Sequence, residues 1–140
     1  MNNVFTFGCR LNFWESEKIN KILIDNKKYN LTVFNTCSVT NEAVKNIVSS
    51  IKKFHLRNPD MKIAVTGCAA ETNFETFKNM NEVSFVIKNN KKLLEESWKK
   101  LPTKKTLTDL HEKDLIKLKK VNPSNSKVRK FIRIQNGCDH

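Results

Sequence analysis

The segment from Leu31 to Cys68, LTVFNTCSVTNEAVKNIVSSIKKFHLRNPDMKIAVTGC, predicts a strand, a helix and a second strand. Its two ends are short apolar runs rich in β-branched and aromatic residues, as is typical of buried strands. Four apolar residues between them recur at helical spacing: Val44, Ile47, Val48 and Ile51. The helix is expected to end at Asn58-Pro59, because proline disfavours a helical conformation in the residue before it. Strands joined by a helix in this way are typical of a parallel sheet.

The same alternation continues on both sides of this segment. Val4–Phe7 and Val83–Ile87 predict two further strands. Helices are expected after each strand. Asn12 would cap the first helix, and Ser38, Thr40 or Asn41 would cap the second. A short helix is expected around Phe74–Lys78, and Asn89 or Asn90 would cap a last helix through Leu93, Leu94 and Trp98. This order predicts an α/β fold with an open parallel sheet and helices on both faces. Right-handed crossovers would then bring the carboxyl ends of all strands to one edge.

The sequence pattern changes after the first hundred residues. We expect residues 1–100 to form one domain, residues 101–127 to form a linker rich in Lys, Thr and Ser, and residues 128–140 to begin a second domain. Basic and apolar residues alternate from Val128 to Ile134, which predicts a strand that has no partner before the sequence stops at His140. The sequence is therefore expected to be the front part of a longer protein.

The composition points to a globular protein with a basic surface. The 140 residues include 26 Lys and Arg against 14 Asp and Glu, a formal net charge of +12. Such an excess favours a polyanionic partner such as RNA, although a solvated lysine surface explains it equally well. No apolar run approaches the roughly 18 residues that a membrane span needs. The N-terminus also lacks the pattern of a secretory signal, so we expect a cytoplasmic protein that does not bind membranes.

Three cysteines follow the first three predicted strands. Cys9, Cys37 and Cys68 would therefore meet at the carboxyl edge of the sheet, where open α/β folds bind their ligands. All three glycines of the chain, Gly8, Gly67 and Gly137, directly precede a cysteine. Three converging thiolates suit a soft metal or an iron–sulfur cluster. A 4Fe–4S cluster held by three cysteines leaves one iron free to bind another group.

The alternative is that each cysteine is a small buried hydrophobe at the end of a strand. The cysteine spacing matches no short metal-binding motif, so the cluster hypothesis depends on the predicted fold. Histidine ligands are not expected from His55, His111 or His140, which lie in the central helix, in the linker and at the end of the sequence. Polar side chains near the cysteines that could donate hydrogen bonds to sulfur, or cap the helices that follow, are Asn12, Asn35, Thr36, Ser38, Thr40 and Thr66.

Four motifs connect the cysteines to a known family. They are TFGCRLN at 6–12 followed by Glu15-Ser16-Glu17, NTCSVT at 35–40 followed by Glu42-Ala43, VTGCAA at 65–70, and IQNGC at 134–138. These motifs resemble those of the radical-SAM methylthiotransferases and occur in that family's order along the whole chain.

The resemblance implies a flavodoxin-like N-terminal domain that binds an auxiliary 4Fe–4S cluster through Cys9, Cys37 and Cys68. It places Cys138 as the first cysteine of the CxxxCxxC motif, whose 4Fe–4S cluster cleaves S-adenosylmethionine in a central barrel domain. The other two cysteines of that motif would follow His140, so this chain alone is expected to be inactive. The implied partners are tRNA, the iron–sulfur assembly machinery and an electron donor.

Arg10-Leu11-Asn12 and the residues around Cys37 most resemble the branch of the family that acts on N6-threonylcarbamoyladenosine at tRNA position 37. A first alternative is the branch that modifies isopentenyladenosine at the same position. A second is a basic RNA-binding module without redox chemistry, using Lys88, Lys91, Lys92, Lys99, Lys100, Lys104 and Lys105. A third, a flavodoxin-like domain that binds a phosphorylated cofactor, is weakened because the chain has no glycine-rich phosphate loop.

Overall fold

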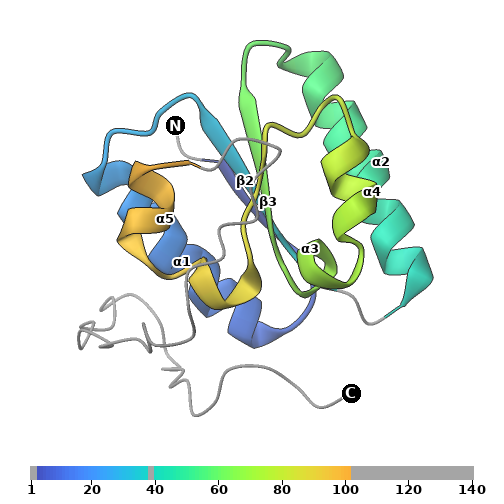
Figure 1. Cartoon of the computed structure of the whole chain (residues 1–140), viewed down its shortest axis with the longest axis horizontal. Coiled ribbons are helices and arrows are strands. Elements are labelled where there is room, and N and C mark those ends of the chain that lie inside the picture. Colours follow the sequence, from blue (N-terminus) through green and yellow to red (C-terminus); the bar gives the residue numbers. More distant parts are fainter. Residues whose placement is uncertain (1–2, 38–39, 102–140) are drawn as a thin grey trace.

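A four-stranded parallel sheet forms the centre of the protein (Figure 1). The computed structural model describes residues 3–37 and 40–101. The strands are β1 (Asn3–Thr6), β2 (Leu31–Thr36), β3 (Lys62–Gly67) and β4 (Phe85–Val86). They lie side by side in the order β1-β2-β3-β4, with Val33 opposite Val4 on one side and Ala64 on the other. The predicted α/β class is confirmed, and β4 is shorter than the predicted strand.

The helices connect and cover these strands. They are α1 (Arg10–Asp25), α2 (Asn41–Arg57), α3 (Cys68–Thr72), α4 (Phe74–Asn79), the 3-10 turn η1 (Asn89–Lys91) and α5 (Glu95–Lys99). Thr40 caps α2 as predicted, because its hydroxyl accepts a hydrogen bond from the Ala43 amide.

Two predicted helix boundaries are wrong. Asn12 does not cap α1, which begins at Arg10 with Cys9 in the cap position; Asn12 instead lies inside the first turn and is buried. The single helix predicted to run through Leu93, Leu94 and Trp98 is divided into η1 and α5. The chain bends between them so that the Trp98 indole can donate a hydrogen bond back to the carbonyl of Lys92.

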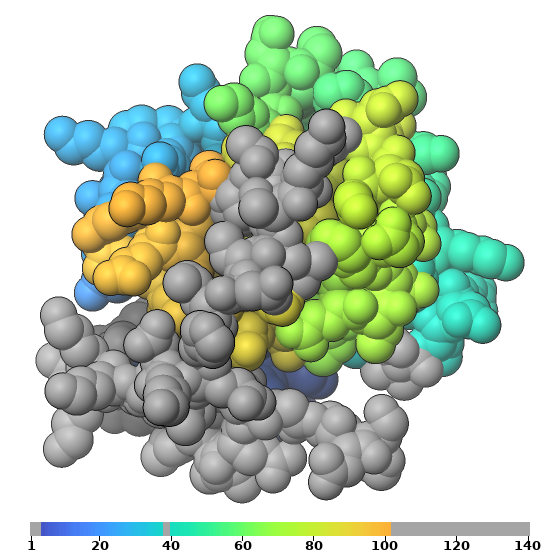
Figure 2. Space-filling view, in the orientation of Figure 1, coloured from blue at the N-terminus to red at the C-terminus, as the bar shows by residue number. Residues whose placement is uncertain are grey.

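Alternate residues of the strands support two apolar layers. Phe34, Ile63 and Val65 pack on one face of the sheet with α2, α3 and α4. Leu31, Val33 and Ala64 pack on the other face with α1 and with Trp98 of α5. In the space-filling view α5 (orange) lies against α1 (blue), on the side of the molecule opposite to α4 and α2 (Figure 2). Burial on both faces explains why these strands are almost wholly apolar.

The distribution of helices is that of a doubly wound sheet, but the strand order is not. In a flavodoxin-like sheet the order is 2-1-3-4-5, so the first strand has a neighbour on each side. Here β1 lies at the edge, and the chain moves in one direction from β1 to β2 to β3. Crossovers of one hand would place α1 and α2 on the same face, yet they cover opposite faces. The two crossovers therefore have opposite hands, which corrects the expectation that all are right-handed.

Several predictions fall on residues that the structure does not describe. The predicted linker beyond Leu101, the predicted strand at Val128–Ile134 and Cys138 all lie outside the described residues, as does Ser38. Within the described part of the chain, none of the helices combines the length and the apolar character needed to cross a bilayer.

Candidate functional site

The three predicted cysteines lie at the carboxyl ends of three neighbouring strands. Cys9 follows β1 and precedes α1, Cys37 follows β2, and Cys68 follows β3 as the first residue of α3. Because β1, β2 and β3 are parallel and adjacent, their ends form one edge, which we call the cysteine edge. Cys9 is exposed, Cys37 and Cys68 are half-buried, and none of the three is in a disulfide.

The glycines before two of these cysteines allow the backbone segments of the cysteine edge to approach closely. Gly8 and Gly67 have φ angles of +96° and +97°, which residues other than glycine rarely adopt. A Cβ on Gly8 would lie 2.8 Å from the Cys37 Sγ atom, so Gly8 contacts the next cysteine along the edge. A Cβ on Gly67 would overlap the backbone of Thr36 in β2.

Replacing Gly67 by alanine is expected to lower the free energy of unfolding by about 1–3 kcal/mol, the cost of a backbone conformation that only glycine adopts readily. Its φ of +97° and ψ of −170° lie in that region, and the Thr36 backbone leaves no space for a methyl group. Urea denaturation measures the change. Ser49→Ala on the exposed side of α2 is the control, expected within about 0.5 kcal/mol of wild type. Equal stabilities of the Gly67 and Ser49 variants would contradict the described backbone.

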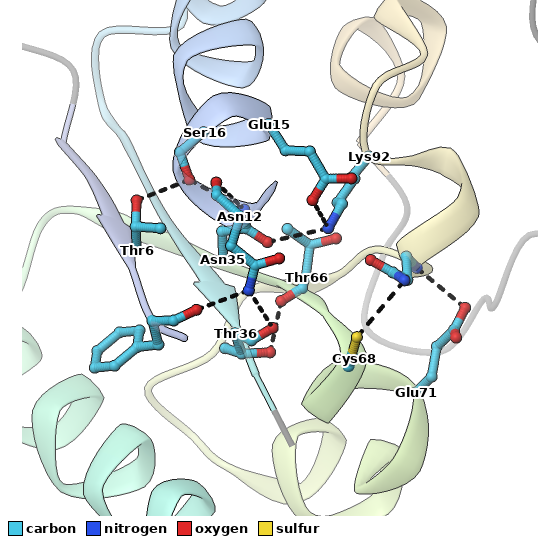
Figure 3. A network of polar contacts seen from close by, with 12 residues as sticks. Thr6, Asn12, Glu15, Ser16, Asn35, Thr36, Thr66, Cys68, Glu71 and Lys92 are labelled. Atoms are coloured by element: carbon cyan, nitrogen blue, oxygen red, sulfur yellow. Dashed lines mark hydrogen bonds and ion pairs between the residues drawn. The ribbon is translucent and has the colours of Figure 1, made fainter. Parts of the chain in front are cut away.

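A buried polar network lies beneath the cysteine edge (Figure 3). Asn12 of α1 donates from Nδ2 to the carbonyls of Phe7 and Thr36, at 2.7 and 3.3 Å. Asn35 of β2 donates from Nδ2 to the Asn12 carbonyl and to the Ser16 hydroxyl, each at 3.0 Å. These hydrogen bonds fix the start of α1 against the end of β2, so they hold the segments that carry Cys9 and Cys37. The predicted role of Asn12 and Asn35 as donors to sulfur is replaced by this structural one.

The network contains a buried ion pair that the sequence did not predict. The Lys92 ammonium contacts the Glu15 carboxylate, and each side chain is only 2% exposed. The Lys92 Nζ atom also lies 3.4 Å from Oδ1 of Asn35, to which it donates. Lys92 therefore links the segment after η1 to α1 and to the end of β2. The spacing of Glu15 and Lys92 in the sequence carries no signal of this pairing.

Cys68 has its own polar neighbours. Nδ2 of Asn89 lies 3.9 Å from the Cys68 Sγ atom, and the Asn89 amide donates to Glu71 of α3 at 3.1 Å. Burial raises the pKa of the Cys68 thiol; Lys92 opposes this rise, while Cys37 and Glu15 add to it. Two thiols of the cysteine edge thus lie within electrostatic reach of each other and of the buried ion pair.

The fit of an iron–sulfur cluster to these residues can be judged from the donor set. Within residues 3–37 and 40–101, no three His, Cys, Asp or Glu side chains are arranged to hold a metal ion as they stand. The three thiols nonetheless share one edge, two glycines bring their segments together, and the buried hydroxyl of Thr66 has no hydrogen-bond partner among the described residues. Soft thiolate donors converging from adjacent strands are those that iron–sulfur clusters use, so the residues fit the group.

The predicted basic surface is only partly present. Lys91 and Lys92 are 6% and 1% exposed, which corrects their assignment to a solvent-facing patch. Lys88 is half-buried, Lys99 and Lys100 are exposed, and Lys99 pairs with Glu95 at 2.9 Å. Lys104 and Lys105 lie outside the described residues. A further half-buried lysine that the sequence analysis missed is on α1, where Lys18 lies 4.7 Å over the Trp14 ring.

The fold and the cysteine edge define an α/β domain of the kind that binds ligands where parallel strands end. Residues 2–88 match the model of the uncharacterized protein family UPF0004, and the chain belongs to that family. No solved structure matches the chain.

Three curated relatives illustrate the similarity. The threonylcarbamoyladenosine tRNA methylthiotransferase MtaB of Rickettsia prowazekii is 42% identical over 98% of this chain and 32% of that protein. MtaB of Thermotoga maritima is 28% identical over 96% of this chain and 33% of that protein. The tRNA-2-methylthio-N(6)-dimethylallyladenosine synthase of Thermodesulfovibrio yellowstonii is 34% identical over 58% of this chain and 21% of that protein. The chain thus spans about a third or less of these relatives, and the predicted resemblance to methylthiotransferases is confirmed.

Proposed function

We propose that this chain is the cluster-binding N-terminal portion of a tRNA methylthiotransferase, with residues 1–100 as its first domain. The observation that carries the proposal is the position of Cys9, Cys37 and Cys68 at the ends of three adjacent parallel strands. The whole enzyme would act on N6-threonylcarbamoyladenosine at tRNA position 37. The Rickettsia prowazekii relative supports this substrate, because it is 42% identical over 98% of the chain, whereas a dimethylallyladenosine synthase that covers 99% of the chain is 29% identical. Dimethylallyladenosine, also called isopentenyladenosine, is the alternative substrate.

In this proposal Cys9, Cys37 and Cys68 bind a 4Fe–4S cluster as thiolates. When bound, the cluster supplies an iron without a protein ligand, where the sulfur that is transferred can be held. The protein's own contribution is to bring the thiolates together and to stabilise their charge. The 16-residue helix α1 begins at Arg10 with Cys9 in its cap position, so the amide groups of its first turn and the positive end of its dipole lie beside Cys9 and favour a negatively charged cluster there.

Cys138 would supply the first ligand of a second 4Fe–4S cluster, which cleaves S-adenosylmethionine. A single cysteine cannot hold that cluster, so we expect the 140-residue chain alone not to catalyse methylthiolation. An electron donor and the iron–sulfur assembly machinery are the further partners that this proposal requires, together with tRNA.

Anaerobic reconstitution with iron and sulfide tests the cluster site directly. We expect about four irons per chain with the brown absorbance of a 4Fe–4S cluster. The Cys37→Ala variant is expected to lose this iron, because one of the three ligands is removed. Cys138→Ser is the matched control and is expected to bind as much iron as the wild type. A wild-type chain that binds no iron would exclude the proposed cluster site.

A second candidate function, RNA binding without redox chemistry, is supported by the net charge of +12. The affinity of the iron-free chain for a tRNA is expected to fall steeply between about 50 and 200 mM salt. The dissociation constant should rise roughly tenfold or more over this range. Binding of this kind together with no iron uptake would favour the second candidate. RNA binding by both the iron-loaded and the iron-free chain is compatible with the methylthiotransferase proposal.

A further inference from the structure

The buried ion pair between Lys92 and Glu15 is out of place for a purely structural contact. Each side chain is 2% exposed. Removing two charges from water costs free energy, and the attraction between them does not always offset that cost. A pair of apolar side chains would fill the same space without that cost. The pair also does not lie deep within either apolar layer; it joins the polar network that ends at the cysteine edge.

The positive end of the ion pair points toward the cysteine edge, and the negative end points away from it. In Figure 3 the Lys92 ammonium lies on the side of the Glu15 carboxylate that faces Thr66 and Cys68. The hydrogen bond from Nζ to Asn35 Oδ1 at 3.4 Å holds the ammonium next to the end of β2, directly before Thr36 and Cys37. The positive member of the pair is therefore the one that faces the cysteine edge.

We propose that the Lys92–Glu15 pair is an electrostatic element of the cysteine edge, which makes a cluster bound by Cys9, Cys37 and Cys68 easier to reduce. Reduction adds one electron to a site that already carries three thiolate charges. A buried positive charge nearby stabilises that added electron, because the low dielectric of the interior screens it weakly. This inference rests on the proposed cluster site and adds to it a role for two residues that do not bind the metal.

The test is a reductive titration of the reconstituted chain, followed by electron paramagnetic resonance, in a Cys138→Ser background so that the three-cysteine site alone is measured. The variant Glu15→Met with Lys92→Met removes both charges together. We expect it to bind as much iron as its parent and to be three- to tenfold harder to reduce; a tenfold change corresponds to 59 mV for a one-electron couple.

Two further variants separate an electrostatic role from a structural one. Glu15→Gln keeps an acceptor for Lys92 but removes the negative charge. Reduction of the cluster is therefore expected to become easier, which is opposite to the change expected for the double variant. Lys92→Arg keeps the positive charge and is expected to leave the reduction equilibrium of the cluster near that of the parent. The Glu15→Gln result stands on its own if the double variant does not fold, as judged by circular dichroism before iron is added.

The control is Lys45→Met, which removes an exposed lysine of α2 and is expected to leave the reduction equilibrium unchanged, because water and salt screen a surface charge. A folded, iron-loaded double variant with the parent's reduction equilibrium would overturn the inference, as would a Glu15→Gln shift in the same direction as the double variant. Absence of iron from the parent chain would instead refute the proposed cluster site, so the two failures are distinguishable.

Discussion

Replacing Lys92 by methionine is expected to lower the free energy of unfolding by about 3–5 kcal/mol, because the Glu15 carboxylate is left buried without its cation. Methionine has nearly the same length as lysine, so the change removes the charge and leaves most of the packing. Both side chains are 2% exposed, and water cannot replace the lost partner without opening the contact between α1 and the segment that follows η1. Urea denaturation followed by circular dichroism measures the difference.

The double variant Glu15→Met with Lys92→Met distinguishes a broken ion pair from a damaged core. Because neither charge remains, it is expected to recover most of the stability that Lys92→Met loses. The control Lys45→Met, at an exposed position of α2, should stay within about 0.5 kcal/mol of wild type. If the double variant is as unstable as the sum of both single variants, the two charges do not interact and the described pair is incorrect.

Truncating Trp98 to alanine is expected to lower the free energy of unfolding by a similar amount, about 3–5 kcal/mol, because it leaves a large cavity in an apolar layer. The Trp98 side chain is fully buried against Ile19 and Leu23 of α1 and against β2. Its indole nitrogen also donates to the Lys92 carbonyl at 2.8 Å. The loss would appear in urea denaturation as a lower midpoint with a similar slope.

Two controls accompany the Trp98 variant. Trp98→Phe keeps an aromatic ring but removes the donor, so a smaller loss of about 1–3 kcal/mol is expected for the unsatisfied carbonyl. Leu56→Ala removes an apolar side chain that is 81% exposed on α2 and should change the stability by less than about 0.5 kcal/mol. A Trp98→Ala variant as stable as Leu56→Ala would mean that α5 does not belong to the core.

The fold could be predicted from the sequence wherever one local pattern determined the structure. The apolar runs of β2 and β3 and the helical spacing of α2 are such patterns, because burial on both faces of a sheet leaves few other choices. The start of α1 was placed wrongly because Asn12 has the side chain of a good cap, while the Thr36 carbonyl, to which it donates instead, is far away in the sequence. Local propensity could not detect this partner.

The candidate site was predicted in outline and not in its supporting contacts. The positions of Cys9, Cys37 and Cys68 at one edge follow from the strand pattern alone, because parallel strands end together. The buried state of Lys92 could not be predicted, since a lysine in a Lys- and Asn-rich run resembles any solvated lysine. Its partner Glu15 lies in α1, far from Lys92 in the sequence, so only the folded chain brings the opposite charges together.

The arrangement of the sheet in the order β1-β2-β3-β4 has a consequence for biogenesis. Each strand joins the outer side of the one synthesised before it, so no strand has to be inserted between two that are already paired. Pairings between consecutive strands close short loops, whose entropic cost is low. A nascent chain leaving the ribosome can therefore add strands one at a time, and the pairing of β1 with β2, which brings the segments of Cys9 and Cys37 to one edge, does not require β3.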